Sequence, residues 1–215
     1  MMNLFTVFDP CTGFFSMNWF GIIVFIFMFP LGFWCCNGSL MVLLNIFMYG
    51  FYKEICNLTH YFNSILFFVS FFFYVIIINL IGLVPYVFTS SSHLVFSLGL
   101  SLPFWFGLMF FGWFNNYNFM FIHMVPIGTP YLLMPFMVLI ETVSNLIRPF
   151  SLAVRLSANM VAGHLMMSLL GGSMNSIMML LFFFVFFGIF IFELAVSFIQ
   201  SYVFMTLSVL YSSEI

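Results

Sequence analysis

Charged side chains stand inside two long apolar segments in the second half of this sequence. They are Glu141, Arg148, Arg155 and Glu193. A charge at the centre of a membrane costs about 2.5–3.5 kcal/mol on insertion scales. An apolar chain that retains four such charges, with the imidazole of His164 nearby, has the groups needed to bind and release protons. We therefore take proton movement within a membrane as the first functional hypothesis.

Helical spacing gathers most of these groups on one face. At about 100° per residue, Arg148 falls about 20° from Arg155. The predicted polar stripe comprises Glu141, Ser144, Arg148, Arg155 and Asn159. His164 is nine residues beyond Arg155 and falls on the opposite face. Pro149 removes one backbone donor and should bend the helix between the two arginines.

The last apolar segment repeats the pattern more weakly. Glu193, Ser197 and Gln200 are spaced so that they share a helical face. Small residues surround Arg155 in sequence: Ser151, Ala153, Ser157, Ala158, Ala162 and Gly163. Because small side chains let helices approach closely, we expect two packed helices with facing polar surfaces.

The composition decides the class of protein. The chain has 215 residues, of which 65% are hydrophobic and 4% charged, with three basic and five acidic side chains. Soluble proteins carry roughly 25% charged residues, so a soluble domain is excluded, as is a disordered chain. Three basic residues cannot neutralise a nucleic-acid backbone, and thus no nucleic-acid partner is expected. Stretches that are apolar on every face favour an all-α integral membrane protein over a β-barrel.

The apolar segments predict one membrane domain over residues 1–215, a bundle of about five to six membrane helices. Spans are predicted at 14–36, 61–86 and 92–114, with an interfacial helix at 40–53. Two longer segments follow, at 131–170 and 175–211. Each would be roughly 55–60 Å long as one helix. Each therefore either breaks into two spans or forms half of a long, tilted hairpin.

Structural explanations for the polar residues stay open at this point. Arg148 and Glu141 could extend to the membrane surface, and Asn159 and Gln200 could be ordinary interhelical hydrogen bonders. The sequence contains no phosphate-binding loop around its single lysine, Lys53, so no bound nucleotide is expected. The cysteines lack metal-type spacing, and we expect neither a metal ion nor a cofactor.

Four sequence motifs resemble subunit a (ATPase subunit 6) of mitochondrial F-type ATP synthases. The longest covers residues 141–165 and reads ETVSNLIRPFSLAVRLSANMVAGHL. The others are ELAVSFIQSYVF at 193–204, NLIGLVPY at 79–86 and NLFTVFDP at 3–10. The resemblance covers nearly the whole chain, and only 40–61 matches weakly.

The resemblance implies a role for each site residue. Arg155 falls on the family's essential arginine, which faces the proton-carrying carboxylate of a rotor ring. His164 and Glu193 fall on the pair that the mitochondrial branch uses in the proton-uptake half-channel, and Glu141 on an acidic position of the release path. Polar positions near the arginine are matched by Asn159 and Gln200. Whether Arg148 and Ser144 take part in the path is left open.

The same resemblance implies partners and a location. The partners are a rotor ring of small hairpin subunits bearing a carboxylate, the peripheral stalk, other membrane-sector subunits and lipid. The location is the mitochondrial inner membrane, and the fold is a helical subunit whose last two helices form a tilted hairpin against the rotor. Alternatives are a secondary transporter or proton channel with the same stripe, and a structural subunit of a respiratory complex.

Overall fold

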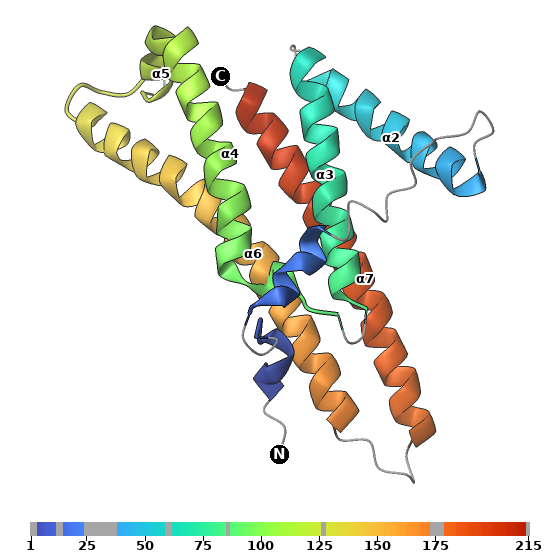
Figure 1. Ribbon diagram of the computed structural model, residues 1–215. Coiled ribbons are helices and arrows are strands. Elements are labelled where there is room, and N and C mark those ends of the chain that lie inside the picture. The colour runs from blue at the N-terminus through green and yellow to red at the C-terminus, as the bar shows by residue number, and fades with distance from the viewer. Residues whose placement is uncertain are drawn as a thin grey trace.

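The computed structural model describes residues 4–11, 15–23, 38–58, 62–84, 87–125, 128–172 and 179–213. The elements in these ranges are all helices, which confirms the all-α fold (Figure 1). The α-helices are α2 (Ser39–Leu58), α3 (Phe62–Gly82), α4 (Leu94–Asn115), α5 (Tyr117–His123), α6 (Met134–Gly172) and α7 (Met179–Ser213). The 3-10 helices are η1 (Leu4–Phe8), η2 (Met17–Phe20) and η3 (Ser90–Ser92).

Four of the described helices are long and apolar enough to cross a membrane: α3, α4, α6 and α7. The chain is therefore an all-α membrane protein. The first predicted span, 14–36, lies mostly outside the described residues. The segment predicted as an interfacial helix at 40–53 lies within α2, which continues for one further turn beyond it.

Helix α3 is the centre of the bundle. Of the residues in its apolar stretch, Ile65–Gly82, 56% are buried, against 11–17% in the apolar stretches of the other three long helices. Its apolar side chains pack against α2 and α7, in a cluster that includes Ile65, Phe72 and Met205. A second cluster joins Val75 of α3 to α6 and α7. Within a membrane such contacts hold helices together through van der Waals packing, because lipid tails are as apolar as these side chains.

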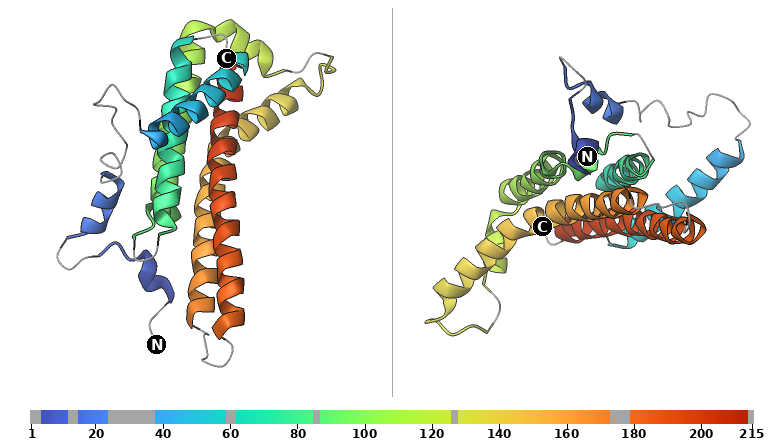
Figure 2. Two further views of the ribbon diagram at one scale, coloured as in Figure 1. Left: turned by 90° about the vertical axis from the view of Figure 1, so that its right-hand side faces the viewer. Right: turned by 90° about the horizontal axis from the view of Figure 1, so that it is seen from below.

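Helices α6 and α7 form a long hairpin with 39 and 35 residues. They span about 58 and 52 Å at 1.5 Å per residue, well beyond the roughly 30 Å of membrane hydrocarbon. The helix α6 stays continuous across Pro149, which is buried. Its first half leans away from α7, whereas its second half runs beside it (Figure 2). The alternative of two broken spans in each segment is thus wrong.

Small residues allow α6 and α7 to pack closely in that second half. On α6 the buried face includes Ala153, Ser157 and Gly163, and on α7 it includes Ser197 and Ser201. The serine hydroxyls donate to carbonyl groups of their own helices, as Ser197 does to Leu194 at 2.7 Å. Their polar atoms are satisfied locally, so the helices approach without leaving donors unpaired.

Helices η1 and η3 also pack against α6. Helix η1 packs against the second half of α6, near the end where α6 meets α7 (Figure 1). Helix η3 packs against α6 as well, and its serines are buried. Within η3, Ser92 donates to the carbonyl of Thr89 at 2.7 Å, and the two hydroxyls lie 2.9 Å apart.

Candidate functional site

The guanidinium group of Arg155 is on the open face of α6. Its neighbours Ala153 and Leu156 are buried against the rest of the bundle, whereas Arg155 is exposed. Within the described ranges no ion pair or hydrogen bond is found for this side chain. A cation on the outside of an apolar helix is costly in lipid. An acidic group placed against this face would stabilise the cation.

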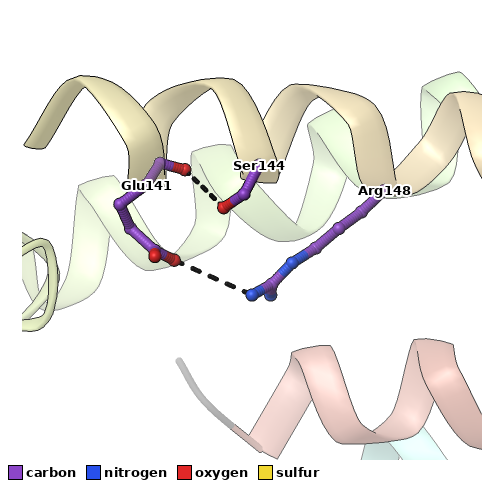
Figure 3. Close-up of polar contacts among 3 residues, drawn as sticks. All are labelled: Glu141, Ser144 and Arg148. Atoms are coloured by element: carbon purple, nitrogen blue, oxygen red, sulfur yellow. Dashed lines mark hydrogen bonds and ion pairs between the residues drawn. The ribbon is translucent and has the colours of Figure 1, made fainter. Parts of the chain in front are cut away.

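Glu141, Ser144 and Arg148 form a charged cluster on the first half of α6 (Figure 3). The Arg148 Nη2 lies 3.7 Å from the Glu141 Oε1, and both side chains are about one-third exposed, at 31% and 33%. Ser144 donates to the Glu141 carbonyl at 2.8 Å. The guanidinium of Arg148 also stacks over the ring of Tyr211 at 4.9 Å. The charges at this end of the hairpin are thus paired within the chain.

A small cavity of about 50 Å³ adjoins this cluster. Its polar lining comes from His123, Glu141, Asn145, Arg148 and Tyr211. The space is enough for a water molecule, which needs a few polar partners to be held. The cluster therefore has the groups and the room to pass a proton to water.

Glu193 is the buried carboxyl group of the hairpin. The residue is 7% exposed, and the carboxyl lies directly against Gly163 of α6, where any Cβ would overlap it. No basic side chain pairs with it among the described residues. An ionised carboxylate without a partner costs several kcal/mol in such a place. The position suits an acid that takes up and gives away a proton.

His164 follows Gly163 on α6 and lines a cavity that phenylalanine side chains of α7 also line. Its ring meets the edge of Phe8 from η1, with 6.2 Å between centroids, and a backbone hydrogen bond joins it to Gly82. Its Nε2 is buried and finds no hydrogen-bond partner in the described part of the chain. That nitrogen is available to water or a proton.

His164 and Glu193, the predicted pair of the uptake path, come from two neighbouring helices. The two residues lie at the same level of the hairpin, because Glu193 touches the neighbour of His164. Across the described ranges no hydrogen bond joins their side chains. A proton passing between them would therefore need water or a side-chain rotation.

The two arginines and the glycine that contacts Glu193 lie at different levels along the axis of α6. Arg155 is seven residues from Arg148 and eight from Gly163, which corresponds to about 10 and 12 Å along the axis. Asn159 and Gln200 are half-buried. The predicted stripe thus separates into a paired cluster at one end and, at mid-helix, an arginine with no ion-pair partner among the described residues.

Sequence reasoning missed four contributors to this site. Tyr211 is near the chain end and carries no charge, so only tertiary contact reveals it under Arg148. Gly163 was recognised as a small residue, but not as the place that accommodates a carboxyl. Asp9 and Asn18 line a cavity together with His164, although more than 140 residues separate them from it.

The sequence is similar to known proteins over its full length. The profile of the family described as "ATP synthase A chain" matches residues 15–213. The "ATP synthase subunit a" of Locusta migratoria is 44% identical over 223 residues, covering 100% of this chain and 99% of the relative. The proteins of the same name from Drosophila melanogaster and Anopheles gambiae are 45% and 44% identical, with the same coverage.

Proposed function

The chain belongs to the ATP synthase A chain family, and we propose that it is the proton-translocating stator subunit of the membrane sector of an F-type ATP synthase. The observation that carries the proposal is the position of Arg155. It lies on an exposed face of a membrane helix, without an ion-pair partner in the described ranges. A rotor subunit with an ionisable carboxyl group is the partner that this face would accept.

In the proposed mechanism the charge of Arg155 controls the rotor. A protonated carboxyl on a rotor helix is neutral and tolerates lipid, whereas the ionised form does not. Arg155 stabilises the ionised form at one angular position only. Its positive charge also repels protons, so protons cannot leak directly past it.

Two separate half-channels follow from the order of groups along α6. Protons enter through His164 and Glu193 at one end of the hairpin and leave through Glu141 at the other. Ser144 and Arg148 contact Glu141 and tune the release side, and Asn159 and Gln200 supply polar positions near the arginine. Each proton must be carried on a rotor carboxyl, as the ring turns, from one half-channel to the other. The potential supplies about 2.3 kcal/mol per charge per 100 mV.

The proposal includes partners and a location. The partners are a rotor ring of small carboxylate-bearing hairpins, the peripheral stalk, other membrane-sector subunits and lipid. The location is the mitochondrial inner membrane, and nucleotide chemistry belongs to other subunits. The large apolar side chains exposed on α6 and α7 supply the surface for the ring and the lipid.

The test is a set of substitutions in the assembled ATP synthase, reconstituted in vesicles. Arg155→Ala should abolish proton transport coupled to ATP synthesis, while the subunit still assembles. Lys53→Ala is the matched control, because it removes an exposed basic group on α2. Blue-native electrophoresis measures assembly, and a pH-sensitive dye measures transport.

The outcomes separate the alternatives. Loss of driven transport with intact assembly supports the stator role. Unchanged transport would contradict it and leave a transporter or channel that does not need this arginine. Failure to assemble would favour a purely structural subunit.

A further inference from the structure

A large cavity opens beside His164, and the N-terminal segment forms its outer wall. The cavity has a volume of about 800 Å³ and lies between that segment, the end of α3, α6 and α7. Its polar lining is Thr6, Asp9, Asn18, His164 and Ser168, and the remainder is apolar. One water molecule occupies about 30 Å³ of liquid. A cavity of this size with one polar side has room for a chain of waters.

Specific contacts hold the N-terminal wall in place. The ring of Phe8 meets His164 edge-on, and η1 packs against α6. Asn18 donates from its Nδ2 to the backbone carbonyl of Asp9 at 3.3 Å, which ties the two N-terminal segments together. The wall is therefore a packed part of the fold, and Asp9 is fixed near the cavity.

Asp9 presents an acidic group at the rim of this cavity. Its side chain is exposed, and its Oδ1 accepts a hydrogen bond from the Cys11 backbone amide at 3.2 Å. The titratable groups that face it are the Cys11 thiol and, across the cavity, His164; no lysine or arginine is among the lining residues. A hydrogen bond with Asp9 and its negative charge raise the pKa of the Cys11 thiol.

We propose that Asp9 is the proton-collecting group of the uptake half-channel, which supplies His164 through water in this cavity. The inference rests on the proposed function and adds a residue far from the hairpin in sequence. A hydronium ion gives its proton to the Asp9 carboxylate. The carboxyl group returns the proton to the water chain, and the buried, unpartnered Nε2 of His164 accepts it. Asp9 regains its charge and attracts the next proton.

The first experiment measures ATP synthesis in vesicles at a fixed potential while the pH on the uptake side is varied. Asp9→Asn should lower the rate about fivefold at alkaline pH, where proton supply limits turnover. The deficit should shrink as the pH falls and protons become abundant. Asp9→Glu should restore most of the rate. Glu54→Gln, an exposed carboxylate outside the cavity, is the charge-matched control and should leave the profile unchanged.

A second measurement tests the water path without relying on turnover. Ser168→Cys in the assembled complex should react with a membrane-impermeant thiol reagent from the uptake side, above the background of the native cysteines. Absence of labelling would overturn the inference, as would an Asp9→Asn rate equal to wild type at every pH. Arg155→Ala is measured in parallel. If it still transports protons, the proposed function itself fails, independently of Asp9.

Discussion

The two ends of the α6–α7 hairpin deal with charge in different ways. At one end, Glu141 and Arg148 neutralise each other at 3.7 Å and remain about one-third exposed. At the other, Glu193 is buried against Gly163, with no basic partner in the described part of the chain. A pair of opposite charges is stable in place, whereas a buried lone acid is stable only when it is neutral. We therefore expect proton transport to be more sensitive to substitutions around Glu193 than to substitutions at the Glu141–Arg148 pair.

Arg155 stands between these ends and resembles neither. It is more exposed than the paired cluster and, like Glu193, has no ion-pair partner among the described residues. No acidic group of the described residues pairs with it, and in the proposed function a rotor carboxyl supplies the counter-ion. The other two environments are formed by the chain itself, so their response to substitution should follow from the observed packing.

Between the two ends of the hairpin, the largest effect is expected at the buried acid. Glu193→Gln keeps the shape and removes the exchangeable proton, so driven transport should fall on the order of 100-fold, as for loss of a general acid–base group. Assembly should be intact, because the amide is neutral and fits the same space. Vesicle acidification measures the rate, with Glu54→Gln as the control. A rate within twofold of wild type would remove Glu193 from the path.

A smaller but still strong effect is expected at the glycine that faces it. The Cβ in Gly163→Ala would overlap the Glu193 carboxyl, which is the far end of a flexible side chain and would have to turn away. Transport should therefore drop about tenfold through misplacement of the acid, with little loss of stability. Gly171→Ala is the matched control, since nothing lies within 4 Å of a Cβ there.

A double variant tests whether the loss of transport in Gly163→Ala arises from displacement of the Glu193 carboxyl. Shortening the acid in the double variant Gly163→Ala/Glu193→Asp should recover part of the transport that Gly163→Ala loses. If Gly163→Ala is harmless, or if the shorter acid gives no recovery, the carboxyl does not depend on that space.

The paired end should respond more weakly. Glu141→Gln leaves the Arg148 charge unneutralised, but a partly exposed pair contributes only about 0–1 kcal/mol. We expect a decrease of about threefold in transport and normal assembly. The double variant Glu141→Gln/Arg148→Gln completes a mutant cycle. Additive losses in the cycle would show that the two groups act independently.

The smallest effect is expected at the aromatic contact. Tyr211→Leu removes the ring beneath Arg148 and should cost about 0.5–1 kcal/mol of stability. Tyr211→Phe keeps the ring and should be close to wild type. Thermal denaturation of the detergent-solubilised complex measures both. Equal losses in the two variants would assign the effect to the hydroxyl.

Helix α6 shows which features of the fold and the site can be predicted from the sequence and which cannot. Apolar length identified it as a long membrane element, and helical phase brought Glu141, Ser144 and Arg148 to one face, as the structure shows. Phase alone did not separate Arg155 from that cluster, because an angle around a helix says nothing of what packs against it. The single continuous helix across Pro149 also required the structure, since a proline bends or breaks a helix according to its neighbours.

The amino-acid sequence by itself determined the membrane class, the two long apolar segments and the residues that carry charge. Each of these depends on local composition and on spacing along one helix. Tertiary structure alone decided that Glu193 reaches Gly163, that Tyr211 lies under Arg148, and that Asp9 faces the cavity of His164. These contacts join segments far apart in the chain, and their distances follow from how the helices pack, which no local pattern encodes.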